Sequence, residues 1–115
     1  MTPVSIPFDP AAPRQQLLLD LAPDGVPVRL LMELQYLPGP GRWFLSLSDF
    51  VSGEALVRRV PLVASYRAVN DLLFPFRARV PGTLFLMPVP NTPSTADPGR
   101  DNLGEFMLIW SDRHA

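Results

Sequence analysis

The chain has 115 residues, which leaves room for one domain with a single hydrophobic core. Apolar residues make up 47% of it and the net charge is only −1, whereas disordered chains combine low hydrophobicity with high net charge. The sequence contains no basic patch that could bind nucleic acid, and no apolar run approaches the roughly 18 residues that span a bilayer. Its start lacks the basic residues of a secretory signal, so we expect synthesis in the cytoplasm.

Proline is strongly enriched, with 15 residues in the chain, whereas about 5% is average. Proline breaks helices but is tolerated in turns, loops and edge strands, so this composition favours β structure with stiff loops. Four of the prolines (Pro3, Pro7, Pro10 and Pro13) fall at the beginning. We therefore expect an extended Pro-rich arm over residues 1–13 and a single β domain over residues 14–115.

Alternation of apolar and polar side chains predicts the strands. It is clearest over residues 26–36, where the side chains of Leu30, Met32 and Leu34 fall on one face. A change to helical spacing, ended by Pro75, predicts one short helix over residues 65–74. With the turn residues between them, the patterns predict about six strands, at residues 16–21, 26–36, 42–48, 54–63, 83–89 and 104–110.

These elements predict an all-β fold, a small antiparallel sandwich or barrel of about six strands with one short helix. The inward faces of the strands predict a core of Val28, Leu30, Met32, Leu34, Trp43, Leu45, Leu47, Phe106 and Leu108. A second apolar set is expected on the opposite faces and comprises Leu18, Leu31, Phe44, Leu84, Leu86, Met107 and Ile109. Either the helix and the Pro-rich arm cover this second set, or other subunits do.

Residues that could carry catalysis are scarce. The sole histidine, His114, is next to last, and chain ends seldom hold a catalytic base in place. There is no cysteine, which excludes disulfides and thiolate metal sites. Asp97 and Asp101 share a loop, but Gly99 and Leu108 occupy positions where a calcium loop needs oxygen ligands. We therefore expect no enzyme activity, no catalytic residue, no cofactor and no metal site.

Two classes of function remain. One is a structural subunit that works by assembling with neighbours; the other is a cytoplasmic β-sandwich binding module that uses the long loop over residues 90–103. The arginine guanidinium groups can form bidentate hydrogen bonds with carboxylates of a partner, and the outward apolar side chains can pack against it. The candidate interface residues are Phe44, Arg58, Arg59, Arg100, Asp101, Asn102 and Ile109.

From Trp43 onward, short segments follow one another in a recognisable order. They are residues 43–49, Gly53, residues 61–63, residues 71–73, residues 83–87 and residues 97–104, the last of which contains Asp101-Asn102-Leu103-Gly104. This order resembles the phage baseplate plug family of contractile-tailed bacteriophages, and Ile6-Pro7 and the strand ending near Tyr36 also fit the usual opening of that family. The chain departs from the family at residues 64–70, where the family is usually more compact and contains a glycine.

The resemblance implies a structural virion protein at the centre of a contractile tail baseplate, near the hub and the distal end of the tail tube. It implies other baseplate subunits as partners, among them hub, tail tube or tube-initiator proteins, and copies of the chain itself. It implies neither enzyme activity, nor sequence readout of nucleic acid, nor a membrane. The protein would then be synthesised in the host cytoplasm and located in the virion.

Overall fold

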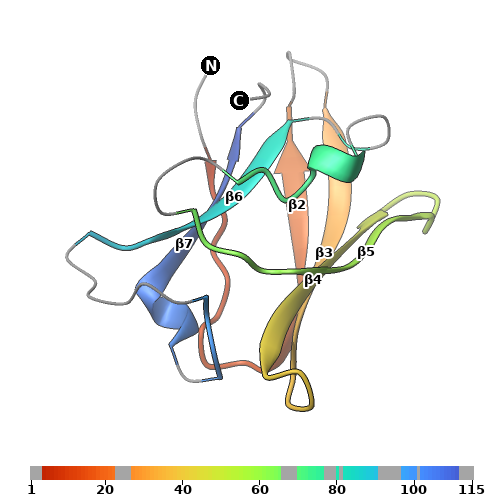
Figure 1. The fold of residues 1–115 in the computed structure, drawn as a ribbon. Coiled ribbons are helices and arrows are strands. Elements are labelled where there is room, and N and C mark those ends of the chain that lie inside the picture. The colour runs from red at the N-terminus through yellow and green to blue at the C-terminus, as the bar shows by residue number, and fades with distance from the viewer. Residues whose placement is uncertain are drawn as a thin grey trace.

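The computed structural model describes residues 4–22, 27–65, 70–76, 80, 82–90, 97–100 and 102–111. In this part of the chain, seven strands form two antiparallel sheets, which confirms the all-β expectation (Figure 1). One sheet has the strand order β1-β7-β6 and the other has the order β2-β3-β4-β5. The strands are β1 (Val4–Ser5), β2 (Arg14–Leu21), β3 (Val28–Leu37), β4 (Arg42–Asp49), β5 (Ala55–Pro61), β6 (Thr83–Pro88) and β7 (Phe106–Ser111).

The strands predicted from alternation are present, with small shifts at their ends. The one that the sequence pattern did not predict is β1, because two residues are too short to show a period. Val4 and Ser5 pair with Trp110 and Ile109 of β7, and the Ile6 N–H then donates to the Leu108 carbonyl at 2.8 Å. Residues 4–6 of the Pro-rich arm therefore extend the smaller sheet.

After β5 the chain crosses from the larger sheet to the smaller one, as the green segment of Figure 1 shows. The Leu62 N–H still donates to Trp43 of β4, at 2.9 Å. Further on, the N–H groups of Ser65 and Leu72 donate to the carbonyls of Leu86 and Leu84 on β6, at 2.6 and 2.7 Å. This crossing segment lies along the edge of β6, so it protects backbone groups that would otherwise be unpaired.

The helix predicted over residues 65–74 is wrong in the part that the structure describes; residues 66–69 lie outside it. Ser65 and the residues from Asn70 to Leu73 are not helical, and one 3-10 turn, η2 (Phe74–Phe76), follows instead. The reason is Asp71, whose Oδ1 accepts hydrogen bonds from the N–H groups of Leu73 (2.9 Å) and Leu84 (3.1 Å). Such a side chain competes with helical hydrogen bonding and here holds the segment against β6.

Asp71→Ala is expected to destabilise the fold by about 1–3 kcal/mol, because it leaves two part-buried N–H groups without their acceptor. Asp71→Asn is the matched control, since its amide oxygen can still accept both hydrogen bonds. Denaturant unfolding of the two variants measures the difference. Equal stabilities would mean that the carboxylate does not hold the crossing segment.

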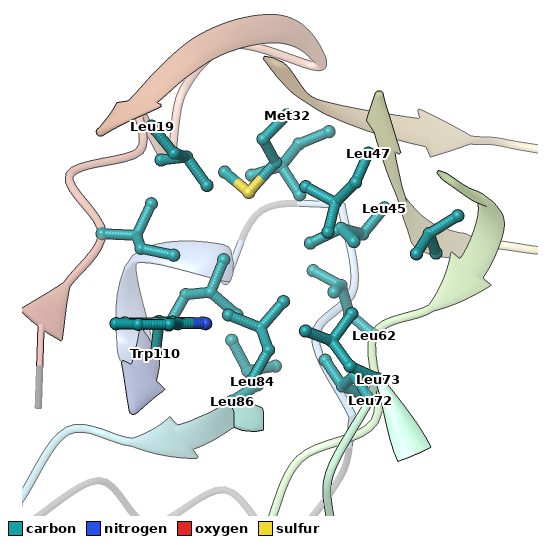
Figure 2. Close-up of a cluster of buried hydrophobic side chains, with 14 of the residues drawn as sticks. Leu19, Met32, Leu45, Leu47, Leu62, Leu72, Leu73, Leu84, Leu86 and Trp110 are labelled. Carbon is teal, nitrogen blue, oxygen red and sulfur yellow. The ribbon is translucent and has the colours of Figure 1, made fainter. Parts of the chain in front are cut away.

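The core lies between the two sheets, where side chains from both meet (Figure 2). Of the nine predicted core residues, eight are buried; Val28 is half-buried and packs against the others. Crossing-segment side chains complete the cluster, among them Leu62, Leu72 and Leu73. The labelled core residues in Figure 2 are Leu19, Met32, Leu45, Leu47, Leu62, Leu72, Leu73, Leu84, Leu86 and Trp110.

The prediction that Leu84 and Leu86 face outward is wrong. They pair with Trp110 and Leu108, so they share the inward face of β7, and each is at most 1% exposed. Residues 83–87 are almost continuously apolar, so alternation could not decide which face is buried. The pairing register decides it, because cross-strand partners point to the same face.

Candidate assembly surfaces

The outward side of the smaller sheet carries four large apolar side chains. Phe85 and Met87 of β6 pair with Ile109 and Met107 of β7, which places the four side chains on one face. Each is half-buried. We call Phe85, Met87, Met107 and Ile109 the β6–β7 outer face. Its exposed apolar atoms make it a surface suited to packing against another protein.

The outward side of the larger sheet carries a shallow groove of about 280 Å³ with a mixed lining. Leu31 lies in it between polar side chains, and Glu33 is 3.7 Å from Arg14. Arg58 lies at the β5 side of the groove. Because its lining combines both charges with apolar side chains, this groove is suited to a partner that offers mixed contacts, unlike the wholly apolar β6–β7 outer face.

The β4–β5 pairing is irregular beside this groove. Leu45 pairs with Val60 and Leu47 with Val57, so Arg58 and Arg59 together oppose Ser46, in a β-bulge. Arg59 has a φ of 48°, and its N–H donates to the Ser46 hydroxyl at 3.0 Å. The bulge therefore presents both arginine side chains to solvent at the edge of the sheet.

At one end of the sandwich, the residues that enter the last strand are tied to β4 and the crossing segment. Asp97 Oδ2 lies 3.1 Å from the Arg42 guanidinium, and its Oδ1 accepts from the Ala64 N–H at 2.9 Å. Asn102 Oδ1 accepts from the Gly99 N–H at 2.5 Å, which closes a short turn. The side-chain oxygens of Asp97 and Asn102 thus bind groups of the protein itself.

Arg100 projects from that turn and is exposed. Shallow hollows surround it, lined by Pro10, Pro13, Tyr36 and Pro38. Proline and tyrosine form a rigid apolar floor, and the guanidinium supplies a charge that can bind a carboxylate bidentately. The hollow is therefore a place where an acidic segment of a partner could dock.

The candidate interface residues do not form one site. Phe44, Arg58 and Arg59 belong to the outward side and edge of the larger sheet, and Ile109 to the β6–β7 outer face. Arg100 and Asn102 lie at the sandwich end, and Asn102 is half-buried in its local turn. Asp101 lies outside the described residues, as do His114 and residues 91–96 of the long loop.

Sequence reasoning missed two residues that shape these surfaces. Arg42 was taken only as the start of a strand, and it holds Asp97 across 55 positions of sequence. Met87 was in neither of the two predicted apolar sets, and it lies on the outward side of β6. Neither has a local signal in the sequence, because both roles depend on long-range pairing.

Within the described ranges, no three His, Cys, Asp or Glu side chains gather closely enough to hold a metal ion. No helix in the same ranges has the length and apolar character needed to cross a bilayer.

Comparisons with known proteins bear on the assembly role. A search of curated proteins finds no match. Residues 4–113, however, match the family model described as cyanophage baseplate Pam3 plug gp18. The match confirms the resemblance to phage baseplate plug proteins over most of the chain. Because it covers nearly the whole sequence, this chain belongs to the family of the cyanophage baseplate Pam3 plug gp18.

Proposed function

We propose that this protein is a structural subunit of a contractile phage tail, located at the centre of the baseplate near the hub and the distal end of the tail tube. Its partners are hub, tail tube or tube-initiator proteins and further copies of the chain. The single observation that carries the proposal is the β6–β7 outer face, an apolar surface on a rigid sheet in a chain of a baseplate plug family. A subunit held by its neighbours needs such a surface, and an isolated soluble protein does not.

Two features support assembly over catalysis. Apolar side chains fill the space between the sheets in one continuous core, and close packing of this kind makes the scaffold rigid. The ion pairs of Arg14 with Glu33 and of Arg29 with Asp20 lie outside this core. The exposed arginines Arg58 and Arg59 lie at the edge of the larger sheet and Arg100 lies at one end of the sandwich, and charges at such exposed positions set partner choice and orientation more than affinity. We therefore propose a role without chemical turnover, in which Phe44 and Asn102 shape contact surfaces beside these arginines.

Ile109→Glu is expected to reduce incorporation of the subunit into phage particles about tenfold or more, because a buried unpaired carboxylate opposes apolar contact. The measurement is the protein composition of purified particles by mass spectrometry, with the melting curve of the isolated subunit beside it. The melting curve should change little, since Ile109 faces away from the core.

Val51→Glu is the matched control, because Val51 is 87% exposed at the tip of the β4–β5 hairpin and belongs to none of these surfaces. Its incorporation is expected to equal that of the unsubstituted protein. If Ile109→Glu and Val51→Glu subunits were incorporated equally well, the β6–β7 outer face would not be an assembly surface. Failure of both with normal melting curves would point to general charge sensitivity and also contradict the proposal.

A further inference from the structure

Strands β2 and β5 are the two edge strands of the larger sheet, and they differ in how well their edges are protected against the addition of another strand. The edge of β5 carries β-bulges, the exposed Arg58 and Arg59, and Pro61. These are the features by which proteins prevent strands from adding to an edge. Strand β2 lacks the bulges and the proline, since it pairs with β3 at eight consecutive positions without a bulge, and its exposed charges, Arg14 and Asp20, are of opposite sign. Its edge is therefore open to another strand.

The backbone groups on that edge follow from the antiparallel pattern. The Tyr36 N–H donates to the Pro13 carbonyl at 2.7 Å, and alternate residues of β2 repeat this orientation toward β3. The pairing of β3 with β4 agrees with this pattern. The Phe50 N–H donates to the Arg29 carbonyl at 3.2 Å, so Arg29 faces β4 and its neighbours in β3 face β2. Residues between those that face β3 must direct their N–H and C=O groups away from the sheet. These outward residues are Arg14, Gln16, Leu18 and Asp20.

We propose that two copies of this chain join through β2, antiparallel, about a two-fold axis that passes beside Leu17. In this register Arg14 lies opposite Asp20 of the second copy, and Gln16 lies opposite Leu18 of the second copy. It is the register in which all four outward residues of each copy meet an outward residue of the other. A shift by two residues leaves Arg14 or Asp20 without an outward partner.

The side chains of β2 are self-complementary in this register. Arg14 and Asp20 are 70% and 65% exposed, so each can reach the opposite charge on the second copy while keeping its own partner, Glu33 or Arg29. Leu18 is 47% exposed, and the two copies of Leu18 become diagonal neighbours across the axis. Opposite charges facing each other at both ends, with leucines at the centre, identify a second copy as the occupant of this edge.

The proposed function includes further copies of the chain as partners, and this inference rests on that part of it and specifies the contact. Its tests use the purified chain, so they can fail while the baseplate role stands. The first test is Leu17→Cys. The two copies of this residue would face each other as a non-hydrogen-bonded pair, with Cα atoms about 4.5 Å apart, which a disulfide can bridge. The chain has no other cysteine, so any cross-link must join two introduced thiols.

The matched control is Leu56→Cys on β5, since Leu17 and Leu56 are both half-buried leucines of edge strands that pack against the core. Under mild oxidation we expect a disulfide-linked dimer from Leu17→Cys and only monomer from Leu56→Cys. Monomer from both, or equal cross-linking of both, would overturn the proposal.

Sedimentation of the chain without cysteine gives a second, independent test. We expect concentration-dependent dimers, and about tenfold weaker dimerisation for Asp20→Arg, which places like charges opposite each other at both ends. Arg58→Asp, a charge change at the edge of β5, should leave dimerisation unchanged. A monomer at every concentration, or equal dimerisation of Asp20→Arg, would contradict pairing through β2.

Discussion

Trp43→Ala is expected to lower the free energy of unfolding by about 3–5 kcal/mol, a large part of the stability of a domain of this size. Trp43 is 2% exposed and is one of the largest side chains of the core. Its indole N–H donates to the Gly99 carbonyl at 2.7 Å, and its ring meets Tyr36 edge to face with centroids 5.6 Å apart. The substitution removes packing in the core and also releases the turn from which Arg100 projects.

Two comparisons separate those contributions, with denaturant unfolding as the measurement. Trp43→Phe keeps most of the packing and loses the hydrogen bond to Gly99, so it should cost less than Trp43→Ala. Leu18→Ala, at a side chain that is 47% exposed, should cost little. Unchanged unfolding of Trp43→Ala would show that the inward face of β4 has been wrongly assigned.

The fold class could be predicted from the sequence because apolar and polar side chains alternate strictly in strands that have one solvent-exposed face. In β3 and β4, buried residues alternate with half-buried ones, so the pattern gave both the strands and their inward faces. The pattern failed at β6, where both faces are apolar, and Leu84 and Leu86 were placed on the wrong side. At residues 65–74 helical spacing was present, but the side chain of Asp71 bonds to β6 instead.

The candidate surfaces were less predictable than the fold, since they arise where distant segments meet. The turn that carries Arg100 is positioned by the bond from Trp43 to Gly99, which joins residues 56 positions apart. The edge of β2 is exposed only because of the strand order in the sheet, and strand order has no local signature. Membership of the baseplate plug family could be predicted from the sequence, because it rests on the order of short segments along most of the chain.

Gly82→Ala is expected to destabilise the protein by about 2–5 kcal/mol, through two costs that add. Gly82 is buried and has a φ of +90°, a backbone conformation that residues other than glycine rarely adopt. A Cβ atom there would also lie 2.5 Å from the Ser111 carbonyl oxygen and 2.5 Å from Trp110 Nε1. The carbonyl belongs to β7, where Ser111 pairs with Thr83, so it cannot move without shifting the strand.

Two other glycines separate the costs, because thermal unfolding of all three variants can be compared. Gly53 has a φ of +76° but nothing within 4 Å of its added Cβ, so Gly53→Ala should show only the backbone cost of about 1–2 kcal/mol. Gly39 has the same open space without a positive φ, so Gly39→Ala should be close to neutral. If Gly82→Ala cost no more than Gly53→Ala, Trp110 and the end of β7 would have to yield easily. That outcome would contradict close packing of Gly82 against β7.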